Sequence, residues 1–235
     1  MTNYTEKLRN FSSCDVADGL LNLYKFADGG CFSNLQRWSG EIKGTTVGTA
    51  YTVLFESDSD VIEEVNYIDF VTEGSIIVLG LSLEYQSSLA PFVKMEQGIY
   101  GGLMSTRAQY LGAAGTVAFG RIRDIDEHRA LNYPVYSYGL SSCAPKMIVK
   151  PSAVNVPITI LCSDGIRRTL EPGDYIVADK NGVVRIPTRL VDMDRLINYI
   201  EKSIEADELV AIDIKNGIPA KKAQTERRAI LKQLL

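Results

Sequence analysis

The chain has 235 residues, of which 46% are hydrophobic, and this content is enough to bury one full core. Its formal charge of −4 combines acidic and basic residues, which excludes the strong basic field that nucleic-acid-binding proteins use. No apolar run approaches the roughly 20 residues of a membrane-spanning helix, and the polar start MTNYTEKLRNF is unlike a secretory signal. We therefore expect one cytoplasmic domain, residues 1–235, with neither nucleic acid nor membrane as partner.

The cysteines and the histidine exclude further classes of site. Cys14, Cys31, Cys143 and Cys162 are far apart and form no CxxC pair, so we expect reduced thiols. The single histidine, His128, excludes zinc sites built on several histidines, and its place in EHRAL is more typical of a structural or surface residue. No P-loop and no GxGxxG after a strand is present, which argues against a nucleotide enzyme.

The N-terminal half alternates helical and strand patterns. Residues 4–26 predict two short helices, with Ser12–Ser13 as candidate caps. A β-rich segment follows at 40–55, then a predicted helix at 61–70, then the apolar run 74–81, which suits a strand covered on both faces. This alternation favours an α/β architecture.

Turn signals dominate the C-terminal half. A strand is predicted over 133–138, and hairpins are predicted at Ser163-Asp164-Gly165 and at Asn181-Gly182. The frequency of hairpins indicates a mixed sheet. Two helices, 190–214 and 219–235, are predicted to close the chain.

Several polar residues are candidates for a site but have ordinary explanations. Asp15 and Asp18 lie where acidic residues usually interact with a helix dipole. Asp174 and Asp179 lie before turns, where acidic side chains commonly accept hydrogen bonds from the backbone. A solvated face explains a third group: Glu84, Glu96 and Gln97.

The stretch 100–127 carries the most specific signal. Gly101 and Gly102 precede a predicted helix, whose unpaired amides and partial positive charge favour an anion. A strand over 116–120 then leads to Arg121, Arg123 and Asp124. In an alternating strand the two arginines share a face and Asp124 points elsewhere, unless a turn brings the groups together. A guanidinium and a hard oxygen ligand are thus predicted beside a helix start.

Three segments, GGLM...GAAGTVAFGRIRD, EHRALNYPVYSYG and PGDYIVADKNGVVRIP, resemble the RraA-like family, and its fungal branch in particular. That family includes metal-dependent 4-hydroxy-4-methyl-2-oxoglutarate aldolases. The resemblance implies an α/β, swivelling-domain type of fold: a mixed β-sheet layered with helices, preceded by N-terminal helices (1–30). It also implies C-terminal helices (190–235) that pack on neighbouring subunits, in a homotrimer or a dimer of trimers.

The resemblance further implies a divalent-metal-dependent lyase that cleaves small 2-oxo acids through a pyruvate enolate, as an aldolase and an oxaloacetate decarboxylase. Arg123 and Asp124 would be catalytic, with Asp124 holding Mg²⁺ or Mn²⁺. Arg123 would bind the substrate carboxylate, and the substrate would also contact Gly101, Gly102, Leu103 and Met104, with the amides of Leu103 and Met104 taking a further oxygen.

The chain departs from the aldolases at one position. They carry an acidic residue, twenty residues and then Arg-Asp, and this spacing places Gly102 at the acidic position. A carboxylate of an adjacent subunit could compensate, and the candidates are Glu201, Glu205 and Glu208. Two alternatives stay open: a Schiff-base aldolase using Lys94 or Lys146, and a non-catalytic trimeric regulator that binds a macromolecule such as a ribonuclease.

Overall fold

The computed structural model describes residues 3–40 and 44–235, and its centre is a mixed ten-stranded sheet. Along the main path the strand order is β1-β12-β11-β3-β4-β6-β7-β2, while β5 pairs with β6 and β8 pairs with β3. The strands are β1 (Cys31–Phe32), β2 (Gln36–Arg37), β3 (Thr46–Ser57), β4 (Ile76–Leu81), β5 (Gly98–Tyr100), β6 (Gly115–Ile122), β7 (Val135–Leu140), β8 (Val149–Val154), β11 (Tyr175–Ala178) and β12 (Val183–Ile186). A separate hairpin pairs β9 (Ile158–Leu161) with β10 (Arg167–Leu170).

The middle of the sheet is parallel and covered on both faces. Strands β3, β4, β6 and β7 run parallel to one another, as does β5 beside β6. Every residue of β4 is buried: Ile77 and Leu79 face a core that includes Ala108, whereas Ile76 and Val78 face a core that includes Ile158. The continuous apolar run of the sequence thus has its predicted role.

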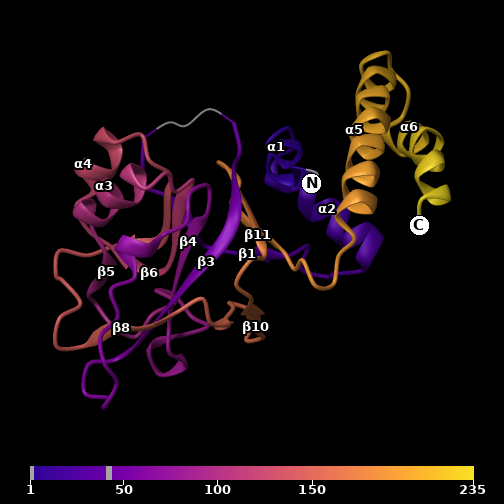
Figure 1. Ribbon diagram of the computed structural model, residues 1–235. Coiled ribbons are helices and arrows are strands. Elements are labelled where there is room, and N and C mark those ends of the chain that lie inside the picture. The colour runs from indigo at the N-terminus through magenta and orange to yellow at the C-terminus, as the bar shows by residue number, and fades with distance from the viewer. Residues whose placement is uncertain (1–2, 41–43) are drawn as a thin grey trace.

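Helices lie in two groups at opposite ends of the sheet (Figure 1). At one end are α3 (Gly102–Tyr110) and α4 (Ile125–Ala130), and at the other are α1 (Tyr4–Leu8), α2 (Ser13–Tyr24), α5 (Met193–Lys215) and α6 (Ala220–Arg227). Helix α2 packs on α5 at Gly19, where a Cβ would lie only 2.8 Å from Cγ1 of Ile200. The small residue lets the two helices approach closely.

Local signals predicted the start of α2 and both hairpins. Ser12 caps α2 in a reciprocal capping box with Asp15. The hairpins β9–β10 and β11–β12 form across the predicted turns at 163–165 and 181–182. Together with the sheet and its helices they confirm the predicted α/β fold with a mixed sheet.

Two helix predictions are wrong in extent. The segment 61–70 has only the 3-10 helix η1 (Ile68–Phe70), because the Val65 amide donates to the Pro151 carbonyl (2.9 Å) and the chain runs irregularly along β8. The final predicted helix, 219–235, ends as α6 at Arg227 and continues as the 3-10 helix η3 (Arg228–Gln233). Residues 41–43 of the predicted β-rich segment lie outside the described residues.

Candidate functional site

The start of α3 is held at the edge of the sheet by backbone contacts. Gly101, the N-cap, has extended backbone (φ −139°, ψ 175°), and α3 begins at Gly102. The Arg123 amide donates to the Tyr100 carbonyl (2.9 Å), which ties the end of β6 to the end of β5. The helix start and the Arg-Asp corner are therefore adjacent.

A left-handed residue brings the charged groups together. Asp124 follows β6 with φ 62° and ψ 45°, a conformation that aspartate tolerates better than most side chains. Its Oδ2 accepts the Gly102 amide (3.2 Å) and lies 3.3 Å from Nε of Arg123. Arg121 points away instead, and its Nη1 donates to the Leu140 carbonyl (3.1 Å). The turn that the sequence left open thus selects Arg123 and not Arg121.

A cavity of about 300 Å³ opens beside this corner. Five of the predicted site residues line it: Gly101, Leu103, Met104, Arg123 and Asp124. Gly102 is buried and does not line the cavity. The Glu127 side chain fills the space that a Cβ on Gly102 would need. The Arg123 and Asp124 side chains are 39% and 31% exposed, so both remain open to a ligand.

Two further charged residues of the lining come from segments that the sequence did not connect with the Arg-Asp corner. Glu64 and Lys146 line the cavity, the latter in the loop that follows β7. The Gly98 amide donates to the Cys143 carbonyl (2.9 Å) and anchors this loop to β5. Lys146 appeared only as a Schiff-base candidate, and Glu64 had no local signal, since it lay in a segment predicted to be a helix. Lys94 does not line the cavity.

His128 belongs to the support behind the site. It is fully buried, its Nδ1 lies 2.9 Å from Oγ of Ser105, and its ring stacks on Tyr100 with centroids 5.8 Å apart. Burial lowers the pKa of His128, which keeps the imidazole neutral. The prediction of a structural role agrees with this contact between α3 and α4.

The other acidic candidates lie away from the cavity. The pKa of Asp179 is lowered, because hydrogen bonds from Ser13 and Asn181 outweigh the effect of burial, and this carboxylate holds the start of α2. Asp174 accepts the amides of Glu171 and Thr188 (3.0 and 3.1 Å). Neither residue lines the cavity, and neither do Glu84, Glu96 and Gln97.

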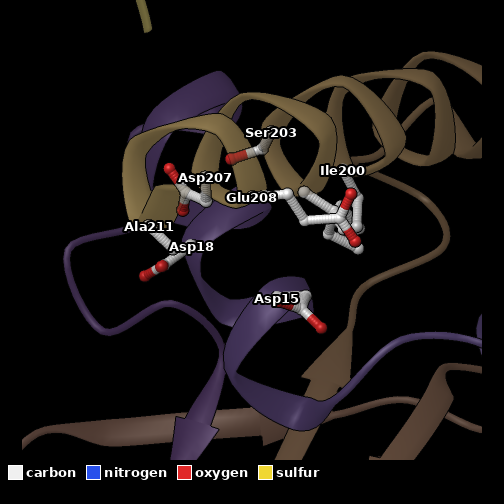
Figure 2. A pocket seen from close by; sticks show the side chains of 8 residues that line it. Asp15, Asp18, Ile200, Ser203, Asp207, Glu208 and Ala211 are labelled. Atoms are coloured by element: carbon white, nitrogen blue, oxygen red, sulfur yellow. The ribbon is translucent and has the colours of Figure 1, made fainter. Parts of the chain in front are cut away.

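Figure 2 shows a second hollow, of about 290 Å³, between α2 and α5. Its lining includes four acids: Asp15, Asp18, Asp207 and Glu208. Burial raises the pKa of Asp18. Glu201, Glu205 and Glu208 all belong to α5, at the opposite end of the molecule from α3 (Figure 1). Within one chain these glutamates therefore do not reach the Arg-Asp corner.

The donor set near the cavity suits a cation that needs few protein ligands. Among the described residues, no three or more His, Cys, Asp or Glu side chains are grouped so that they could enclose a metal ion. Mg²⁺ and Mn²⁺ are commonly held by one or two carboxylates together with water and substrate. Both contacts of Asp124 use Oδ2, which leaves Oδ1 for a cation. The corner therefore fits Mg²⁺ or Mn²⁺ and does not fit a zinc cage.

Comparison with known proteins finds a family profile, two sequence relatives and a solved structure that resemble this chain. The profile of the RraA-like family, described as Aldolase/RraA, matches residues 13–185. Protein DlpA of Legionella pneumophila is 28% identical over 96% of this chain, and a protein of Halalkalibacterium halodurans named "Putative 4-hydroxy-4-methyl-2-oxoglutarate aldolase" is 32% identical over 56% of it. The chain spans 34% of the first relative and 59% of the second. An uncharacterized protein of Pseudomonas syringae, whose structure is solved, is 26% identical with a TM-score of 0.73, over 94% of this chain and 96% of that one.

Proposed function

Because the chain belongs to the RraA-like family, whose description joins aldolases and RraA proteins, we propose that it is a divalent-metal-dependent lyase acting on small 2-oxo acids. The substrates we assign are 4-hydroxy-4-methyl-2-oxoglutarate, for aldol cleavage, and oxaloacetate, for decarboxylation. One observation carries the proposal: Arg123, Asp124 and the start of α3 meet at a single cavity. The described residues form no helix long and apolar enough to span a membrane. As part of the same proposal, we place the chain in the cytoplasm and treat residues 1–235 as one domain.

The anionic end of the substrate has two partners in this cavity. The Arg123 guanidinium can donate two charge-assisted hydrogen bonds to the substrate carboxylate, each contributing about 1.5–3 kcal/mol. The Met104 amide already donates to the Gly101 carbonyl (3.1 Å), so the structure differs here from the expectation of two free amides. Within residues 3–40 and 44–235 the Leu103 amide has no recorded acceptor, and we assign it to a substrate oxygen.

Asp124 would hold the cation in this proposal, with Oδ1 as the oxygen that its protein contacts leave open. A bound Mg²⁺ or Mn²⁺ supplies a Lewis acid that withdraws electrons from the 2-oxo oxygen when the C3–C4 bond breaks. Arg123 would orient the adjacent substrate carboxylate, since Asp124 Oδ2, at 3.3 Å from its Nε, helps to position the guanidinium. Leu103 and Met104 give this side of the cavity an apolar lining.

Pyruvate release tests the proposal directly. Both substrates are supplied to the full chain with Mg²⁺, with Mn²⁺ or with EDTA, and the rates are corrected for the metal-catalysed reaction without protein. We expect turnover with either metal and none in EDTA. Asp124→Asn should lower turnover by roughly 100-fold or more. Asp126→Asn is the matched control, because that side chain is 95% exposed and forms a long ion pair with Arg129, at 3.8 Å.

Other outcomes identify the alternatives. Full activity in EDTA rejects the metal mechanism, and inactivation by borohydride in the presence of substrate indicates a Schiff base on Lys146, the lysine that lines the cavity. If neither substrate yields pyruvate, the lyase proposal fails. A non-catalytic regulator of a macromolecule such as a ribonuclease is then the remaining explanation.

We also propose that the chain self-associates, as a homotrimer or a dimer of trimers. Helices α5 and α6 extend away from the sheet (Figure 1), and α5 exposes Leu209 and Ile212 by 44% and 52%. Burying such side chains stabilises an assembly. Sedimentation analysis of the wild-type chain and of Leu209→Glu measures the mass; a wild-type monomer would reject this assignment.

A further inference from the structure

Helix α4 places a carboxylate against the glycine at the start of α3. A Cβ built on Gly102 would overlap Oε2 of Glu127 and lie 2.5 Å from its Cβ. Real Cβ atoms essentially never come this close to another heavy atom. The space that a side chain at position 102 would need is therefore filled by the stem and carboxylate of Glu127.

The neighbouring glycine has the same relation to Asp124. A Cβ built on Gly101 would lie 2.7 Å from Asp124 Oδ2, and this oxygen also accepts the Gly102 amide. Asp124 is the N-cap of α4, and Glu127 is the third residue of that helix. Two successive glycines, the N-cap and first residue of α3, thus each face one carboxylate from the start of α4.

In the part of the chain that the structure describes, the Glu127 carboxylate makes no hydrogen bond or ion pair, whereas Asp126 on the same turn pairs with Arg129. An acid in a first helical turn interacts favourably with the helix dipole, but this does not require contact with another helix. Asp124 and Glu127 are both exposed, and the contacts of Asp124 with Gly102 and Arg123 use Oδ2. Asp124 Oδ1 and the Glu127 carboxylate are therefore both open to a cation at this corner.

We propose that Glu127 supplies the second acidic group of the divalent-cation site, with Asp124 as the first. The inference rests on the proposed function, because it uses the same cation. Glu127 does not line the cavity, so the cation lies at its rim, between Asp124 Oδ1 and the Glu127 carboxylate, which contacts the cation directly or through a coordinated water. This acid comes from the same chain, and no acid at position 102 or on α5 is needed.

Binding of Mn²⁺ alone tests the assignment without any turnover. Free Mn²⁺ is measured by electron paramagnetic resonance during titration of the full-length wild-type chain and of the variants Glu127→Gln, Asp124→Asn and Asp126→Asn. We expect Glu127→Gln to weaken Mn²⁺ binding by roughly 10- to 100-fold. Asp124→Asn should weaken it more than Glu127→Gln does, and Asp126→Asn should bind Mn²⁺ like the wild type. Thermal unfolding in EDTA verifies that each variant is folded.

Moving the carboxylate adds a gain-of-function test. Glu127→Gly frees the space beside Gly102, and Gly102→Asp in the same chain returns an acid to it. We expect this double variant to bind Mn²⁺ more tightly than Glu127→Gly alone. A folded double variant that binds no better contradicts the idea that both positions serve one cation.

The two proposals fail in different ways. If Asp124→Asn abolishes Mn²⁺ binding while Glu127→Gln binds like the wild type, Glu127 is not part of the site and the proposed function stands. If the wild type binds no Mn²⁺, or if Asp124→Asn has no effect, the cation site itself is wrong and both proposals fall.

Discussion

Replacing Gly102 by alanine tests the packing on which the cation site depends. The new Cβ would lie 2.5 Å from Glu127 Cβ, which is the stem of that side chain and cannot rotate away. Overpacking of this kind costs about 1–3 kcal/mol. The higher helix propensity of alanine offsets this cost by up to about 1 kcal/mol at a helix start. We expect a net loss of about 1–2 kcal/mol in the free energy of unfolding, or about 2–8 °C in Tm for a chain of this size.

A double-mutant cycle attributes this loss to one contact. Glu127→Gly alone should cost about 0.5–1 kcal/mol, because glycine weakens the short helix α4. In that background Gly102→Ala should become neutral or slightly stabilising, since the clashing Cβ is gone. The coupling between the two positions is then about 1–3 kcal/mol, the cost of the overpacking that Glu127→Gly removes.

The cycle compares the wild type, Gly102→Ala, Glu127→Gly and the double variant. Their free energies of unfolding are measured in urea by circular dichroism, with EDTA present so that no cation contributes. Gly101→Ala is the matched control, because its Cβ would meet Asp124 Oδ2 at 2.7 Å and Arg123 Nε at 3.2 Å, and none of its three nearest atoms belongs to Glu127. Additivity of Gly102→Ala and Glu127→Gly within about 0.5 kcal/mol would refute the reasoning.

Three further predictions concern the scaffold. Burial lowers the pKa of His128, so the folded chain binds a proton less readily than the unfolded one, and the free energy of unfolding should fall as pH drops through about 6.5. His128 is the only histidine, so His128→Asn should remove this dependence of the unfolding free energy on pH, measured by urea unfolding at pH 5.5–7.5. An unchanged dependence in the variant contradicts the assignment. Asp179→Ala should cost about 2–4 kcal/mol in thermal or urea unfolding, because the amide and hydroxyl of Ser13, at 2.9 and 2.7 Å, lose a buried charged acceptor; a loss under about 1 kcal/mol argues against this role. Gly80→Ala should cost about 1–3 kcal/mol, because the new Cβ would overlap Cγ2 of Ile158, and Ile158→Ala in the same chain should relieve part of this loss.

Much of the fold followed from local signals, because the groups concerned are neighbours in sequence. The serine at position 12 and the acid three residues later make a capping box, and Asn181-Gly182 makes a hairpin turn. The uninterrupted apolar run of β4 predicted a strand buried on both faces. The segment 61–70 had a helical pattern, yet the hydrogen bond from Val65 to Pro151 of β8, 86 residues later, holds it in an irregular conformation.

The sequence by itself determined which groups could carry the chemistry: a guanidinium, an aspartate and a glycine-opened helix start within about twenty-five residues of one another. Only the tertiary structure decided how they combine. The left-handed backbone of Asp124 selects Arg123 over Arg121, and the packing of α4 on α3 sets Glu127 over Gly102. Glu64 and Lys146 complete the cavity from distant segments. The physical reason is that a site is defined by distances between side chains, and those depend on backbone turns and helix packing that no spacing along the chain encodes.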